Sequence, residues 1–177
     1  ARTRIRDKEL FSLFAKVAIG LPDDRFSPQN VANIVNAFAK NGIRSYPLFQ
    51  RMSEVTRTFP VERCDAQAVA NILNAFSKLE IQDDELFNHL AQATKCTPAA
   101  AFTSQGLANT LNAHAKMGPV DLELFAYLSG VIITSAPLSS DERFKNRSIL
   151  RFDSQAVANV VNAFARVDIV NQKLFDH

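Results

Sequence analysis

Sixteen polar side chains recur at fixed spacing in this sequence, and their types suit binding rather than bond making. Each of four sets contains one Gln, two Asn and one cation. The sets are Gln29, Asn33, Asn36 and Lys40; Gln67, Asn71, Asn74 and Lys78; Gln105, Asn109, Asn112 and Lys116; and Gln155, Asn159, Asn162 and Arg166. Amides both donate and accept hydrogen bonds, whereas Lys and Arg pair with carboxylates or phosphates. The pattern therefore indicates a polar binding surface.

The segments that carry these side chains are close copies of one another. NVANIVNAFAKNG at residues 30–42 returns as AVANILNAFSKLE at 68–80, GLANTLNAHAKMG at 106–118 and AVANVVNAFARVD at 156–168. The first two steps are 38 residues and the third is 50 residues. Self-similarity with a period in this range is typical of stacked repeats.

A second apolar segment follows each copy, and cap residues precede both kinds of segment. The second segments are marked by Phe11, Phe49, Phe87, Phe125 and Phe175. Residues that favour the N-cap position stand before the first segments at Ser27, Asp65, Thr103 and Asp153, and before the second at Asp7, Ser45, Asp83, Asp121 and Asn171. The sequence therefore predicts an all-α fold, a right-handed α-solenoid of two-helix repeats of about 38 residues, with helices A and B in each repeat.

We expect one solenoid over residues 1–177, without a domain boundary. Its parts are a basic N-terminus with an orphan B helix (1–24), repeats at 25–62, 63–100 and 101–150, and a partial repeat at 151–177. The third repeat carries an inserted basic loop at 134–151. Insertions in repeat proteins form surface loops, often on the binding face. Basic residues in the loop and the N-terminus join the candidate RNA-binding set: Arg143, Lys145, Arg147, Arg2, Arg4 and Arg6.

Helical rotation separates an apolar side of helix A from the polar set. Val31, Val35 and Phe38 gather on one side, and the amides and the cation lie on the opposite side, on the expected concave face. Two interpretations of the amides stay open: a ladder of hydrogen bonds between neighbouring repeats, or a groove that presents amides to RNA. Because the set hardly varies between repeats, it cannot by itself read a varied base sequence.

Several function classes receive no support from the residues. The three His and two Cys lack metal-ligand spacing, and His114 merely takes the place of Phe38 in its repeat. There is no phosphate loop or nucleophile motif, so we expect a protein that is not an enzyme and has no cofactor, metal or small-molecule substrate. No apolar run is long enough to span a bilayer, which predicts no membrane contact. The net charge of +2 leaves the choice of partner to the placement of charges.

SPQNVANIVNAFAKNG followed by LFQRM, and AQAVANILNAFSKLEIQDDELFNHL, resemble the octotricopeptide and heptatricopeptide repeat proteins, helical RNA-binding proteins of mitochondria and plastids that often carry a RAP domain. The resemblance implies a mitochondrial (alternatively plastid) protein that holds or stabilises RNA, most specifically ribosomal RNA in a mitoribosome, beside neighbouring proteins. Two features depart from those families: Asn occupies positions where an aromatic residue such as Trp is common, and no RAP domain is present.

A rival hypothesis is a protein-protein interaction scaffold whose concave groove binds a partner helix or tail. The nearly neutral net charge favours the scaffold. One cation at the same place in every repeat favours RNA.

Overall fold

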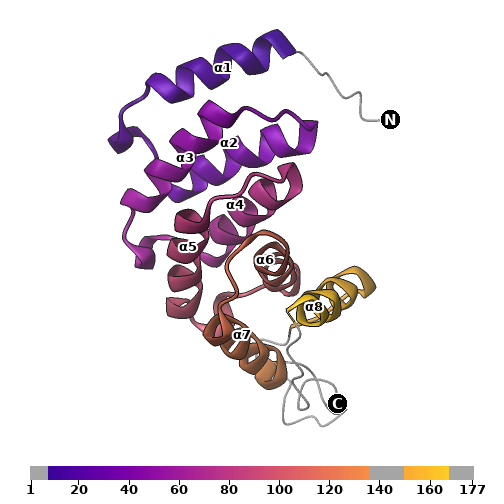
Figure 1. Cartoon of the computed structure of the whole chain (residues 1–177). Coiled ribbons are helices and arrows are strands. Elements are labelled where there is room, and N and C mark those ends of the chain that lie inside the picture. The colour runs from indigo at the N-terminus through magenta and orange to yellow at the C-terminus, as the bar shows by residue number, and fades with distance from the viewer. Residues whose placement is uncertain (1–7, 136–149, 168–177) are drawn as a thin grey trace.

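The computed structural model describes residues 8–135 and 150–167 of the chain, and every regular element among them is helical (Figure 1). The α-helices are α1 (Lys8–Gly20), α2 (Pro28–Asn41), α3 (Tyr46–Thr58), α4 (Ala66–Leu79), α5 (Asp84–Cys96), α6 (Ser104–Met117), α7 (Leu122–Ser135) and α8 (Ser154–Arg166). Short 3-10 helices, η1 (Asp23–Arg25), η2 (Val61–Arg63) and η3 (Ala99–Ala101), lead into α2, α4 and α6. The predicted all-α repeat fold is confirmed.

The helices form two layers that run along one stack (Figure 1). The A helices α2, α4, α6 and α8 pack on one another in order, and the B helices α1, α3, α5 and α7 form the second layer. The most extensive contacts in the fold are those between successive A helices. Each repeat is thus held mainly by its neighbours, as expected of a solenoid.

Most of the predicted N-cap residues in the described part of the chain stand at helix starts and form side-chain cap bonds. Ser27, Asp65, Thr103 and Asp153 each accept a hydrogen bond from the backbone N–H three residues later, at the start of an A helix. Asp83 and Asp121 do the same for α5 and α7. Ser45 occupies the N-cap of α3 but makes no side-chain cap bond, so its expected capping role is wrong. Asp7 and Asn171 lie outside the described residues.

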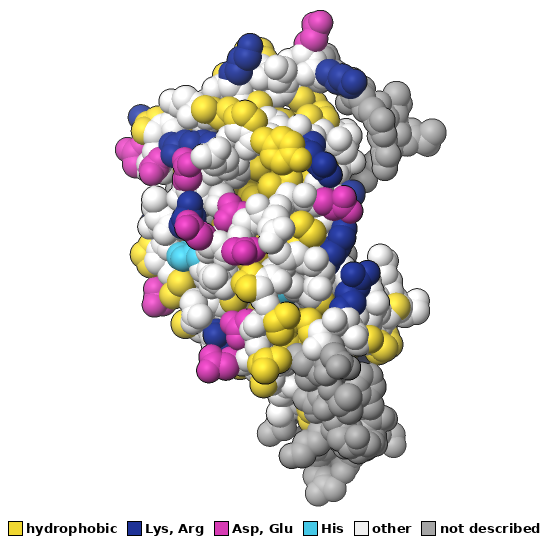
Figure 2. Space-filling view, in the orientation of Figure 1, with side chains coloured by type: hydrophobic (Ala, Val, Ile, Leu, Met, Phe, Trp, Pro, Cys, Tyr) yellow, Lys and Arg dark blue, Asp and Glu magenta, His cyan; other side chains and the backbone are white. Residues whose placement is uncertain are grey.

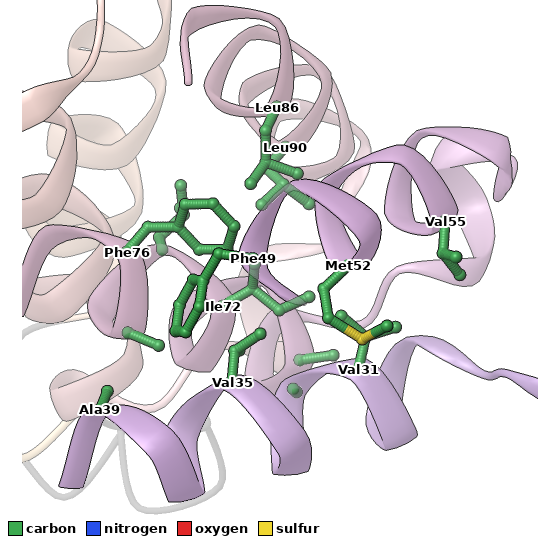
Figure 3. Close-up of a cluster of buried hydrophobic side chains, with 14 of the residues drawn as sticks. Val31, Val35, Ala39, Phe49, Met52, Val55, Ile72, Phe76, Leu86 and Leu90 are labelled. Atoms are coloured by element: carbon green, nitrogen blue, oxygen red, sulfur yellow. The ribbon is translucent and has the colours of Figure 1, made fainter. Parts of the chain in front are cut away.

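The core lies between the two layers and repeats with the sequence. Val31 and Val35 of α2 gather with Phe49 and Met52 of α3, and side chains of α4 and α5 continue the same cluster (Figure 3). A B-helix ring meets the edge of the next A-helix ring at centroid distances of 4.9–5.4 Å in four places: Phe11 with Phe38, Phe49 with Phe76, Phe87 with His114, and Phe125 with Phe164. Edge-to-face contacts of this kind add to the stabilisation from buried apolar area.

The inserted segment leaves the stacking of the fourth repeat intact. The Leu150 N–H donates to the Ser135 carbonyl over 3.1 Å, which joins the end of α7 to the lead-in of α8. The A helix α8 then packs on α6 as α6 packs on α4. Arg143, Lys145 and Arg147 of the insertion lie outside the described residues, as do Arg2, Arg4 and Arg6.

Helix α1 carries an exposed apolar surface. Leu10, Phe14 and Val17 are 44–56% exposed, whereas the side chains one repeat later are fully buried: Leu48, Met52 and Val55. In that later repeat the A helix α2 covers them, and none of the described residues covers α1 in the same way.

None of the helices in the described part of the chain is long and apolar enough to cross a membrane.

His114 stands where other repeats have a core Phe, and its effect on the free energy of unfolding depends on pH. Its side chain is 2% exposed, and neither ring nitrogen has a hydrogen-bond partner among the described residues. Burial lowers the pKa of His114 to about 4, and the nearby Asp121 carboxylate only partly opposes this. The unfolded chain therefore takes up a proton near pH 6.5, where the folded chain does not.

We expect His114→Phe to remove a loss of stability on acidification. Between pH 7 and pH 5 the wild-type free energy of unfolding should fall by about 2 kcal/mol more than that of the variant, because only the unfolded state protonates this group in that window. Urea unfolding of both chains at the two pH values measures the difference. Equal losses in both chains would contradict the assignment, since other titrating groups are common to the two.

A matched pair of cap substitutions tests the difference between α3 and α5. Asp83→Ala should lower the free energy of unfolding by about 1 kcal/mol, because the Leu86 N–H loses its acceptor at 2.9 Å. Ser45→Ala at the equivalent position should change it by only a few tenths of a kcal/mol, because no side-chain cap bond exists there. Chemical denaturation at neutral pH gives both values, and similar losses would disprove the distinction.

Candidate nucleic-acid interface

The sixteen recurring polar side chains all lie on one open side of the A helices, which we call the A-helix face. Every one of them is exposed or half-buried. They occur at the same positions of α2, α4, α6 and α8, so the stacking of these helices joins four separate sets into one surface. The structure thus brings the predicted residues together on one side of the stack.

Small residues allow the A helices to pack closely enough for this surface to be continuous. Ala32, Ala70 and Ala108 are at most 3% exposed and flank the polar sets at successive interfaces. Ala75 and Ala113 are buried on the opposite edge, whereas the equivalent Ala37 of the first A helix is exposed. Neighbouring sets are therefore separated by one interhelical spacing, roughly 8–10 Å.

The amides of the A-helix face do not form a ladder between repeats. Within the described residues, the one hydrogen bond between two of these amides runs from Gln29 Nε2 to Asn33 Oδ1, 3.0 Å apart in the same helix. In this part of the chain no hydrogen bond joins an amide of one repeat to an amide of the next. The ladder interpretation is therefore wrong, and the amides keep donors and acceptors that a ligand can use.

The cations of the A-helix face differ in their surroundings. Lys40, Lys78 and Arg166 are exposed and make no ion pair with any residue that the structure describes. Lys116 instead lies 3.3 Å from Glu80 Oε1 and 3.2 Å from the Ser77 carbonyl oxygen. One of the four positive charges is thus balanced by a carboxylate of the preceding repeat.

The cations of the B helices α3 and α5, by contrast, pair with acids from adjoining parts of the stack, whereas Lys8 and Lys16 of α1 make no ion pair with a described residue. Arg51 contacts Asp23 at 2.5 Å, and Arg57 pairs with Glu85. Lys95 lies 3.1 Å from Asp121 and 3.2 Å from Glu123. Partial burial acts to lower the pKa of Lys95, but the hydrogen bonds to the two carboxylates raise it overall. These charges therefore serve contacts within the protein.

Figure 2 shows the resulting mixture of charges on one view of the molecule: Lys and Arg side chains occur at several levels of the stack among Asp and Glu side chains. No large area of that view carries a single sign. The positive potential available to a ligand comes from particular unpaired side chains rather than from the net charge.

A second row of cations was missed by the sequence reasoning. Arg25, Arg63 and Arg151 stand two residues before the caps of α2, α4 and α8, and Ala101 takes this position before α6. All three Arg are exposed and make no ion pair with a described residue. These Arg residues follow the same repeat spacing of 38 and 50 residues as the polar sets. They precede the A helices, however, and so lie outside the segments whose close similarity defines the repeat.

Other titratable residues of the described part do not assemble into a site. No group of three or more His, Cys, Asp or Glu among these residues could hold a metal ion. Cys64 is buried, and burial raises the pKa of its thiol to about 11, which keeps it protonated and unreactive. Cys96 is exposed and free. The unpaired cations and amides of the A-helix side remain the strongest candidate site.

Comparison with known proteins assigns most of this chain to one described family. A family described as RNA-editing substrate-binding complex 6 protein matches residues 1–137 of the 177 residues. A family described as a protein of unknown function matches residues 143–161. The comparison with curated proteins found no match. The matches support the coarser expectation of a helical, RNA-associated family and do not single out the octotricopeptide or heptatricopeptide repeats. Because the first match covers well over half of the chain, the chain belongs to the RNA-editing substrate-binding complex 6 protein family.

Proposed function

We propose that this chain holds single-stranded RNA on its A-helix face as part of an RNA-editing substrate-binding complex. The observation that carries the proposal is the contrast in pairing: Lys40, Lys78 and Arg166 lack acidic partners among the described residues, whereas every cation of α3 and α5 has one. Unpaired cations in a row can neutralise successive phosphates of one strand. The family name points to the same kind of partner.

The neighbouring amides fit this role. Asn and Gln side chains contact phosphate and sugar oxygens as donors and base edges as donors or acceptors. Because the four sets are nearly identical, the surface as a whole should grip RNA with little dependence on sequence. The proposed activity is binding and presentation of RNA rather than catalysis.

The family also bears on the assembly and its location. A ribosomal role was the more specific expectation from the resemblance to octotricopeptide and heptatricopeptide proteins, and nothing in the comparisons favours a ribosome over an editing complex. We therefore propose an RNA-editing complex with RNA and protein partners, located in the mitochondrion, as that resemblance also implied.

A triple substitution tests the proposal against the rival scaffold hypothesis. Lys40→Ala, Lys78→Ala and Arg166→Ala together should reduce the slope of log K against log salt by about 2 for binding to an unstructured single-stranded RNA, from three contacts of about 0.7 each. Fluorescence anisotropy over a salt series measures the slope.

The control is Arg57→Ala, which removes a cation that pairs with Glu85 on the B-helix side. It should leave the slope unchanged. If the triple variant keeps the wild-type slope, the cations of the A-helix face do not meet phosphates, and a protein helix or tail becomes the better occupant of this face.

The pairing of Lys116 gives a prediction of opposite sign. Glu80→Gln should release the Lys116 ammonium, which lies 3.3 Å from the carboxylate, and so raise RNA affinity about threefold at low salt. The same anisotropy assay checks this. Combining it with Lys116→Ala provides the control, since a gain that depends on the Lys116 ammonium must vanish when that cation is absent. A gain that persists would assign the effect to Arg44, which also lies 3.9 Å from the Glu80 carboxylate, or to lost repulsion from Glu80 itself.

A further inference from the structure

A pocket opens between α4 and α6 where the third repeat departs from its neighbours. Its volume is about 360 Å³, within the range of small-molecule sites, roughly 300–1,000 Å³. Gln67 and Asn71 line it from α4, and Gln105 and Asn109 line it from α6. Ala66 and Ala70 lie between them as small apolar residues.

Two substitutions within the repeat pattern create the space. Ala101 lines the pocket at the position where the other repeats carry Arg25, Arg63 and Arg151. Gly106 lines it where the neighbouring repeats carry Ala68 and Ala156. A Cβ atom at Gly106 would lie 3.8 Å from Ala70 Cβ, on the facing helix, and 3.0 Å from Thr103 Oγ1. The third repeat thus lacks both side chains that would narrow the gap.

The lining selects the chemistry of the occupant. Every lining residue is uncharged, so the pocket does not provide the cation that a buried phosphate requires. Four amides instead supply both donors and acceptors, which match the mixed hydrogen-bonding edge of a nucleobase. The small apolar residues between them can contact the face of a flat ring.

Two Arg residues belong to the segments beside this pocket. Arg63 precedes the lining residue Ala66 by three positions, and its guanidinium lies 6.0 Å from the centroid of the Phe59 ring. Ser104 Oγ donates to the Arg151 carbonyl, which holds that segment beside the lining residues Thr103 and Gln105. The segments next to the pocket therefore each carry one cation.

We propose that this pocket receives one unstacked nucleobase of the RNA strand, an inference that rests on the proposed function. The rest of the A-helix face grips the strand without regard to sequence, and the pocket between the second and third repeats fixes one nucleotide by its base. It is a single site produced by Ala101 and Gly106, and not a position repeated in every repeat.

Gly106→Leu tests the pocket, with Gly130→Leu as its matched control. Both replace a helical Gly by the same residue, but no atom lies within 4 Å of a Cβ at Gly130. The probe is an unstructured RNA of roughly 12 nucleotides with a central 4-thiouridine. Gly106→Leu should lower the affinity for this RNA about tenfold, which corresponds to the loss of one well-held base. Gly130→Leu should leave the affinity unchanged.

Photo-cross-linking with the same probe locates the base directly. Mass spectrometry of the wild-type complex should find the cross-link in peptides containing Gln67 and Asn71 or Gln105 and Asn109, and Gly106→Leu should remove it. Thermal unfolding of each variant confirms that the fold persists.

A second variant keeps the test decisive even if Gly106→Leu fails to fold. Ala101→Arg with Gly106→Ala gives the third repeat the residues that its neighbours already accommodate. It should lose the cross-link although its added cation raises the salt slope by about 0.7. RNA binding that is equal in the Gly106 and Gly130 variants, with cross-links elsewhere, overturns the pocket and leaves the proposed function standing. A wild-type chain that binds no RNA overturns both.

Discussion

Close packing of one A helix on the next is the constraint on which the rest of this structure depends. Ala32, Ala70 and Ala108 are buried where a larger side chain would force the helices apart. Edge-to-face contacts between aromatic rings then link each B helix to the A helix that follows, as Phe49 contacts Phe76. With the apolar residues and the alanines engaged in these two interfaces, the open side of every A helix is left for polar residues. The binding surface is thus a geometric consequence of the way the core is built.

That geometry also explains why the cations of α3 and α5 find acidic partners. Long side chains on successive B helices reach acids near the helix starts of an adjoining repeat, as Lys95 reaches Asp121 and Glu123. The A-helix cations stand near the ends of their helices, where Gly42 and Gly118 follow two of them and Glu80 alone among the described residues supplies a carboxylate. Surface pairs of this kind contribute little to stability, so unpaired cations cost the fold almost nothing. They can therefore be kept for a ligand.

Repetition and its exceptions have different uses here. A nearly invariant polar set gives uniform grip along the stack but no means of fixing register on an RNA strand. Exceptions to the pattern can supply it: Ala101 and Gly106 open space in the third repeat, and Glu80 balances one cation. His114 is another exception, and it weakens the core in a pH-dependent way without creating a ligand contact. Departures from a repeat therefore need to be judged by whether they change the open side or the core.

The sequence by itself determined the two-helix repeat, the caps and the side of each A helix that carries the amides, because these depend on helical periodicity and on contacts within a few residues. Only the tertiary structure decided that Ser45 makes no cap bond, that the amides do not bridge repeats and that Lys116 pairs with Glu80. It also revealed the pocket at Gly106. Each of these depends on distances of a few ångströms between repeats or on the local path of the backbone, which residue spacing along a chain does not fix.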